Sequence, residues 1–81
     1  MKIIITRQDV LDNPIYEDPG TCPAARVLQR TLNDPDISMV WDMVSSKRKE
    51  IGKLKDMFTY KEFNALKEGK IQKFVTEYTP I

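Results

Sequence analysis

The sequence predicts an α+β fold, a small single domain over residues 1–81 with a three- to four-stranded, mainly antiparallel sheet and two helices on one face. Three observations predict this fold. A chain of 81 residues has the length of one domain. The first segment is a β-branched run and the middle and last segments alternate, as in strands, and apolar residues recur with helical spacing in two segments between them. The resulting order β-α-β-(β)-α-β is typical of the α+β class.

Three segments have strand patterns. The β-branched run at 2–6, KIIIT, predicts a strand that is buried on both faces, as in the centre of a sheet. Residues 36–44 alternate and predict a strand with one strongly apolar face, which we expect to lie in the core. Its members are Ile37, Met39, Trp41 and Met43. If that face is open instead, Met and Trp side chains suit an adaptable protein interface. Residues 71–78 predict the closing strand.

Residues 45–55 permit two interpretations. We favour a hairpin turn near Ser45–Lys49 followed by a short strand from Ile51 to Leu54. The alternative is a basic helix over the same residues. The first interpretation adds a fourth strand to the sheet.

Two segments begin with helix N-terminal signals. The first helix starts with Thr21 or Cys22 as N-cap, has Pro23 in its first turn and closes at Asn33. The second opens with a Thr59-x-x-Glu62 capping box and ends before Gly69.

A long connection, residues 7–20, precedes the first helix. It contains two prolines, a glycine and the acids Asp9, Asp12, Glu17 and Asp18, and residues 9–12 have the pattern of one helical turn. A loop of this length is often functional. The spacing of the acids matches no calcium loop, so we expect a solvated loop and no metal site.

Composition narrows the possible functions. The chain has no histidine and one cysteine, which excludes an internal disulfide and the usual zinc patterns. The commonest general base is also missing, so we expect no enzyme activity, no catalytic residues and no cofactor. No apolar run approaches the roughly 20 residues of a membrane span, and the N-terminal MKIII is too short for a signal peptide. We therefore expect a cytoplasmic protein without a membrane partner.

Charge is segregated along the chain. Residues 1–46 contain four Lys/Arg and seven Asp/Glu, a net charge of −3, whereas residues 47–81 contain nine and five, a net charge of +4. Such asymmetry steers partners and favours self-association, so a homodimer is possible.

The helix start Cys22-Pro23-Ala24-Ala25 and the segments Phe63–Gly69 and Phe74–Tyr78 resemble a group of small phage and prophage proteins of unassigned function. Their recurring motif is Cys-Pro-(Val/Ala)-Ala. The resemblance implies a phage-derived accessory protein in an infected bacterial host. It implies no particular activity.

The basic stretch is the first candidate for a binding site, because clusters of cations attract acidic proteins or nucleic acids. The predicted partner-binding residues are Lys47, Arg48, Lys49, Lys53, Lys55 and Tyr60. The alternative is a solvated hairpin.

The start of the first helix is the second candidate, because helix N-termini bind phosphates. The residues of this alternative ligand or anion site are Gly20, Thr21, Cys22, Arg26 and Arg30. Cys22 itself has two interpretations. It is either a reactive thiol activated by the helix dipole or a buried cap residue.

From these observations we expect a phage-type accessory protein that binds and neutralises a host protein, such as a defence or regulatory factor. Two alternatives remain open. The chain sequesters a nucleotide or another phosphate ligand, or it binds nucleic acid weakly.

Overall fold

The computed structural model describes residues 1–81 and has three helices and five strands. In chain order these are β1 (Lys2–Thr6), α1 (Arg7–Asp12), α2 (Pro23–Leu32), β2 (Ile37–Val40), β3 (Met43–Ser46), β4 (Lys49–Leu54), α3 (Tyr60–Lys67) and β5 (Lys73–Pro80). The strands form one antiparallel sheet in the order β1-β5-β4-β3-β2. The α+β class is therefore confirmed, with one strand and one helix more than predicted.

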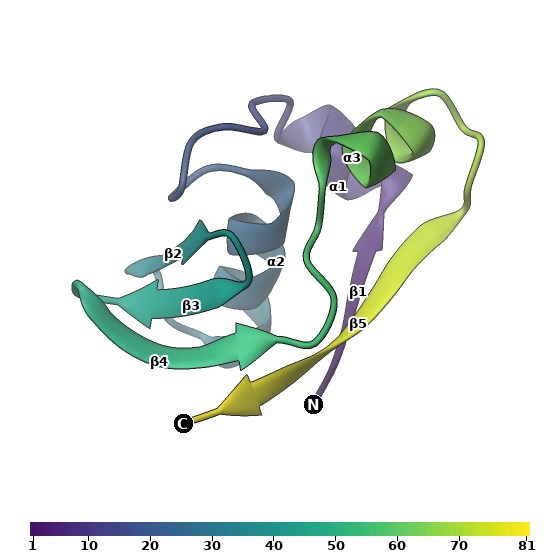
Figure 1. The fold of residues 1–81 in the computed structure, drawn as a ribbon. Coiled ribbons are helices and arrows are strands. Elements are labelled where there is room, and N and C mark those ends of the chain that lie inside the picture. Colours follow the sequence, from purple (N-terminus) through teal and green to yellow (C-terminus); the bar gives the residue numbers. More distant parts are fainter.

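The sheet curls around α2, which contacts both edge strands, β1 and β2 (Figure 1). The buried side of α2 carries small and aliphatic side chains, and the strands contribute aliphatic side chains from their inner face. The core includes Ile3, Ile5, Ala25, Val27, Leu28, Ile37, Val44, Leu54 and Leu66. Helices α1 and α3 contact each other near the ends of β1 and β5. No helix combines the length and apolar character needed to cross a membrane.

The predicted central position of β1 is wrong. β1 lies at one edge of the sheet and alternates, with Ile3 and Ile5 buried and Ile4 37% exposed. Ile4 stands opposite Val75 of β5, which is also exposed, so this pair lies on the outer face of the sheet. A run of isoleucines marks a strand but does not show how many of its faces are covered.

The predicted long strand over 36–44 is also wrong. The chain turns at Trp41 and Asp42, and β2 and β3 form a tight hairpin in which Val40 pairs with Met43. Ile37 and Met39 are buried as predicted, but Trp41 is 76% exposed and is not part of the core. The turn is unusual because Trp41 adopts a left-handed backbone conformation, with φ of 60°.

The hairpin predicted near Ser45–Lys49 is confirmed. Lys47 and Arg48 form the turn, both with positive φ. The following strand, β4, contains the predicted Ile51–Leu54 segment and begins two residues earlier, at Lys49. Gly52 is buried on the inner side of β4, where a Cβ atom would lie 2.5 Å from the Tyr78 ring. A side chain at position 52 would therefore displace Tyr78.

The two predicted helix starts have different outcomes. Cys22 is the N-cap of α2 with Pro23 in the first turn, and Asn33 closes the helix in a left-handed conformation, as predicted. Thr59 is the N-cap of α3, but its side chain makes no capping bond. Thr59 Oγ1 and Glu62 Oε2 are both buried without a hydrogen-bond partner. The predicted capping box is therefore not formed.

A capping box forms instead at α1. The Thr6 Oγ1 atom accepts a bond from the Asp9 amide at 3.3 Å, and the Asp9 carboxylate accepts bonds from the Thr6 amide and hydroxyl at 2.8 and 2.9 Å. Asp9 is thus a buried structural residue, and only part of the predicted acidic loop is solvated.

Candidate functional site

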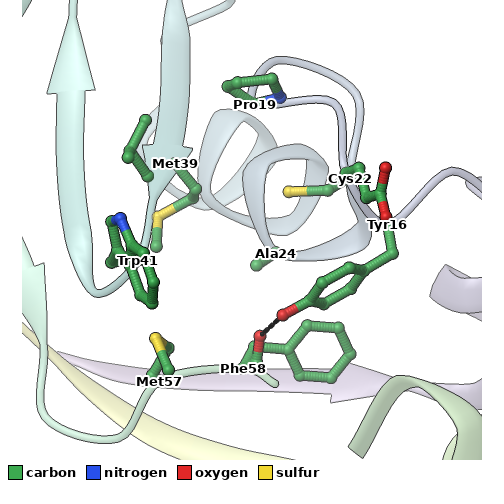
Figure 2. Close-up of a pocket in the computed structure, with 10 residues that line it drawn as sticks. Tyr16, Pro19, Cys22, Ala24, Met39, Trp41, Met57 and Phe58 are labelled. Atoms are coloured by element: carbon green, nitrogen blue, oxygen red, sulfur yellow. Dashed lines mark hydrogen bonds between the residues drawn. The ribbon is translucent and has the colours of Figure 1, made fainter. Parts of the chain in front are cut away.

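An apolar pocket lies where three parts of the chain meet. These are the loop before α2 with the first turn of that helix, the end of β2 with the β2–β3 turn, and the connection from β4 to α3 (Figure 2). The pocket has a volume of about 280 Å³, and eight of its ten lining residues are hydrophobic. They are Tyr16, Glu17, Pro19, Cys22, Ala24, Met39, Val40, Trp41, Met57 and Phe58.

Trp41 forms the outer wall of the pocket beside the two thioether side chains, Met39 and Met57 (Figure 2). A bulky residue in a left-handed conformation costs about 1–2 kcal/mol. Backbone strain of this kind concentrates at functional sites. Trp41 combines this strain with 76% exposure, so burial does not account for its presence at this position.

Tyr16 fixes the loop that closes one side of the pocket. Its hydroxyl donates a hydrogen bond to the Phe58 carbonyl at 3.0 Å, drawn as a dashed line in Figure 2. Its ring makes an edge contact with Phe63, with ring centroids 5.5 Å apart. Burial raises the pKa of Tyr16, and the charges of Cys22 and Glu62 raise it further. The neutral phenol is therefore kept as a hydrogen-bond donor, and the loop and the connection to α3 are held together.

Cys22 lies in the wall of the pocket as a buried cap residue. Its Sγ atom accepts a hydrogen bond from the Ala25 amide at 3.4 Å, and the residue is only 6% exposed. Burial raises the pKa of the thiol despite the bonds from backbone amides, which lower it. Because the thiolate is the nucleophilic form, a protonated thiol is poorly reactive at neutral pH. The geometry favours the buried-cap interpretation.

Glu17 is the only charged residue that lines the pocket. Asp18, Asp42 and Asp56 are immediate chain neighbours of lining residues. Each of these four residues is exposed, and none forms an ion pair within the chain. No lysine or arginine lines the pocket itself. Asp42 also lines a second hollow that contains Lys53 and Lys55, so the charges beyond the pocket wall are mixed.

The predicted anion site at the start of α2 has few free donors. The amides of Gly20, Thr21 and Cys22 all donate to Asp18, and the Ala25 amide donates to the Cys22 thiol. The two arginines of this candidate site are also engaged elsewhere. Arg26 bonds to Gln29 at 3.1 Å, and Arg30 forms an ion pair with Asp9 at 3.4 Å. The geometry gives little support to a phosphate ligand at this position.

The predicted partner-binding residues do not form one cluster. Lys47, Arg48 and Lys49 occupy the β3–β4 turn, at the end of that hairpin far from the connection to α3 (Figure 1). Lys53 and Lys55 line a second, polar hollow together with Asp42 and Glu77. Tyr60 stands apart on α3, 57% exposed, where it contacts the rings of Tyr16 and Phe63.

The sequence interpretation missed the pocket as a site. It favoured a core position for Trp41, with an open interface face as the alternative, and it did not consider Met57. It expected Tyr16 to pin the loop at 7–20 to the core, and Tyr16 does pack against the core. The sequence contains one signal for a turn at this point. A charged residue, Asp42, directly follows Trp41 within the alternating segment, and a charged residue is compatible with a turn. The structure shows no group of three or more histidine, cysteine or acidic side chains arranged to hold a metal ion.

Comparison of the chain with protein-family models, curated proteins and solved structures found no match. Function is therefore argued from the pocket and its surroundings.

Proposed function

We propose that this protein acts by binding another protein, and that a bulky apolar side chain of the partner enters the pocket beside Trp41. The observation that carries the proposal is an exposed tryptophan in a strained backbone conformation on the rim of an apolar pocket. Tryptophan is enriched among the residues that dominate binding energy at protein interfaces.

The lining of the pocket favours an apolar side chain as its occupant, because eight of its ten residues are hydrophobic and one is charged. Pockets for small molecules range from roughly 300 to 1,000 Å³ and usually contain several polar groups that fix the ligand. This pocket has about 280 Å³ and one charged lining residue. Met39 and Met57 are flexible and polarisable, so they adapt their shape to the inserted group.

The resemblance to phage proteins supports a host factor as the partner and the cytoplasm of an infected bacterium as the location. In this proposal the partner is neutralised by occupation of its surface, and the protein carries out no catalysis. The separate basic turn at Lys47–Lys49 would then supply a second contact to a partner large enough to reach it.

Capture experiments with matched variants test the proposal. The wild-type protein, Trp41→Gly and Arg48→Gly are immobilised, and proteins retained from a bacterial lysate are compared by mass spectrometry. Trp41 and Arg48 are both exposed turn residues with positive φ, so the two substitutions are equivalent for the backbone. We expect a partner that the wild type and Arg48→Gly retain and Trp41→Gly loses. A partner lost only with Arg48→Gly would instead assign the function to the basic turn.

A further inference from the structure

We infer that a second copy of this chain pairs with β1, so that the two sheets join edge to edge. The two β1 strands run antiparallel, and Lys2 of each copy stands opposite Ile4 of the other. The inference goes beyond the proposed function and does not depend on it, because no residue of β1 or β5 lines the pocket.

The hydrogen bonds of β1 leave four backbone groups open. In an antiparallel pair, residues that bond to the neighbouring strand alternate with residues whose backbone groups point away from it. The two bonds between Met1 and Tyr78, at 3.1 and 2.7 Å, set this alternation for β1 and β5. The N–H and C=O groups of Lys2 and Ile4 therefore point away from β5, and no other part of the chain bonds to them. A row of such groups is a template for another strand.

The core does not use this side of β1. Ile3 and Ile5 are buried on the inner face of the sheet, from which α2 contacts the strand. Lys2 and Ile4 alternate with them and are exposed. The N-terminal strand thus lies at the end of the sheet with β5 on only one side of it (Figure 1).

The opposite edge of the sheet, β2, is already occupied by the same chain. The Met39 amide donates to the Pro19 carbonyl at 2.8 Å, and the Gln29 side-chain amide donates to the Ile37 carbonyl at 2.9 Å. A second copy therefore finds its open edge at β1. Pairing of β1 with β1 uses the same edge on both copies, so it closes as a two-fold dimer and does not continue as a fibre.

The open groups also select the register. With Lys2 opposite Ile4, each of the two residue pairs exchanges two hydrogen bonds, so all four open groups of each copy are used. A shift that places Lys2 opposite Lys2 brings like charges together. The other shift places Lys2 opposite Thr6, but the Thr6 amide already donates to the Asp9 carboxylate at 2.8 Å.

The side chains on the outer face fit this register. Ile4 stands opposite Val75, and the two are 37% and 39% exposed. In the dimer, Lys2 of the second copy lies beside Ile4, where its aliphatic stem covers this apolar pair. Lys2 stands opposite Glu77 of its own copy, so its ammonium group has a carboxylate on one side and no cation on the other. The arrangement is complementary in charge as well as in hydrogen bonding.

Proline substitutions test the pairing, because proline removes an N–H group and is tolerated in an edge strand where that group points outward. Ile4→Pro removes two of the four hydrogen bonds between the copies and none to β5. Ile4→Thr is the matched control, since it shortens the apolar side chain but keeps the amide. Sedimentation equilibrium from micromolar to millimolar concentration gives the Kd of the dimer, and circular dichroism checks the fold. Lys2→Pro and Lys2→Thr form a second pair at the first residue of the strand, and they decide the test if Ile4→Pro does not fold.

We expect a weak dimer of the wild type, with a Kd between micromolar and millimolar, because one strand from each copy makes a small interface. Each proline variant should raise the Kd about tenfold or more, since two hydrogen bonds are lost. Each threonine variant should stay within a few-fold of the wild type. Hydrogen exchange of the wild type should show the Ile4 amide becoming protected as the concentration rises, while the Ile3 and Ile5 amides are protected throughout.

Four results would overturn the inference. They are a monomer at every concentration, an equal Kd for the proline and threonine variants, an Ile4 amide whose exchange does not depend on concentration, and a dimer that is lost in Trp41→Gly but kept in Ile4→Pro. The last result would assign self-association to the pocket face. None of the first three bears on the pocket, so the proposed function would stand.

Discussion

Replacement of Trp41 by glycine tests whether this residue serves binding or the stability of the fold. Trp41 is 76% exposed, so about a quarter of its side chain is buried. A fully buried tryptophan removes up to about 250 Å² from water, and a quarter of this area stabilises the fold by roughly 1.5 kcal/mol at about 25 cal/mol per Å². Glycine relieves the left-handed backbone strain of about 1–2 kcal/mol and costs about 0.5–1 kcal/mol in chain entropy.

These terms nearly cancel, so we expect Trp41→Gly to change the free energy of unfolding by less than about 1.5 kcal/mol. A tryptophan in the core would lose about 3–5 kcal/mol on truncation. The assay is urea denaturation followed by far-ultraviolet circular dichroism, with Arg48→Gly as the control at the other turn. A loss of 3 kcal/mol or more would refute the reasoning, since it would make Trp41 a structural residue.

Three further predictions concern stability. Gly52→Ala places a Cβ atom 2.5 Å from the Tyr78 ring and should destabilise the fold by about 1–3 kcal/mol in urea denaturation. Burial raises the pKa of Cys22 above its ordinary value of 9.0, so the unfolded chain loses this proton first and stability should fall as pH rises above about 9. Denaturation midpoints between pH 8 and 10 should show a flatter profile for Cys22→Ala, and an unchanged profile would contradict the shift. Asp9→Ala removes the bonds to Thr6 and the ion pair of α1 with α2 and should cost about 1–2 kcal/mol by thermal unfolding. A loss below about 0.5 kcal/mol would contradict that role.

The elements with local signals were predictable from the sequence. The start of α2 follows from Cys22-Pro23, because proline suits a first helical turn and a short polar side chain caps it. Its end follows from Asn33, which tolerates the left-handed conformation. The alternation of Phe74, Thr76 and Tyr78 correctly gave the inner face of β5. In each case the deciding interaction lies within a few residues.

The errors arose where distant parts of the chain decide the outcome. β1 lies at the sheet edge because β5 pairs with one of its sides and α2 contacts it, and no local pattern specifies this. The β2–β3 turn has Trp41 and Asp42 at its centre, without the glycine or asparagine that usually marks a tight hairpin. Apolar residues continue through this turn, so the alternation suggested one long strand.

The pocket could not be predicted because its walls come from segments far apart in sequence. Tyr16, Met39 and Met57 are brought together only when the loop before α2, β2 and the connection to α3 have packed. The sequence did show that charge is segregated, and Glu17, the one charged residue that lines the pocket, belongs to the acidic half of the chain.

The central claim is that an apolar side chain of a partner occupies the pocket beside Trp41. The most direct test is a methyl nuclear magnetic resonance titration of the isotope-labelled protein with an alanine-rich helical peptide that carries one central leucine. The account predicts shifts of the Ala24, Met39 and Met57 methyl signals, with little change at Ile4 and Val75 on the outer face of the sheet. Shifts confined to Ile4 and Val75, or unchanged pocket methyl signals at peptide saturation, would contradict it.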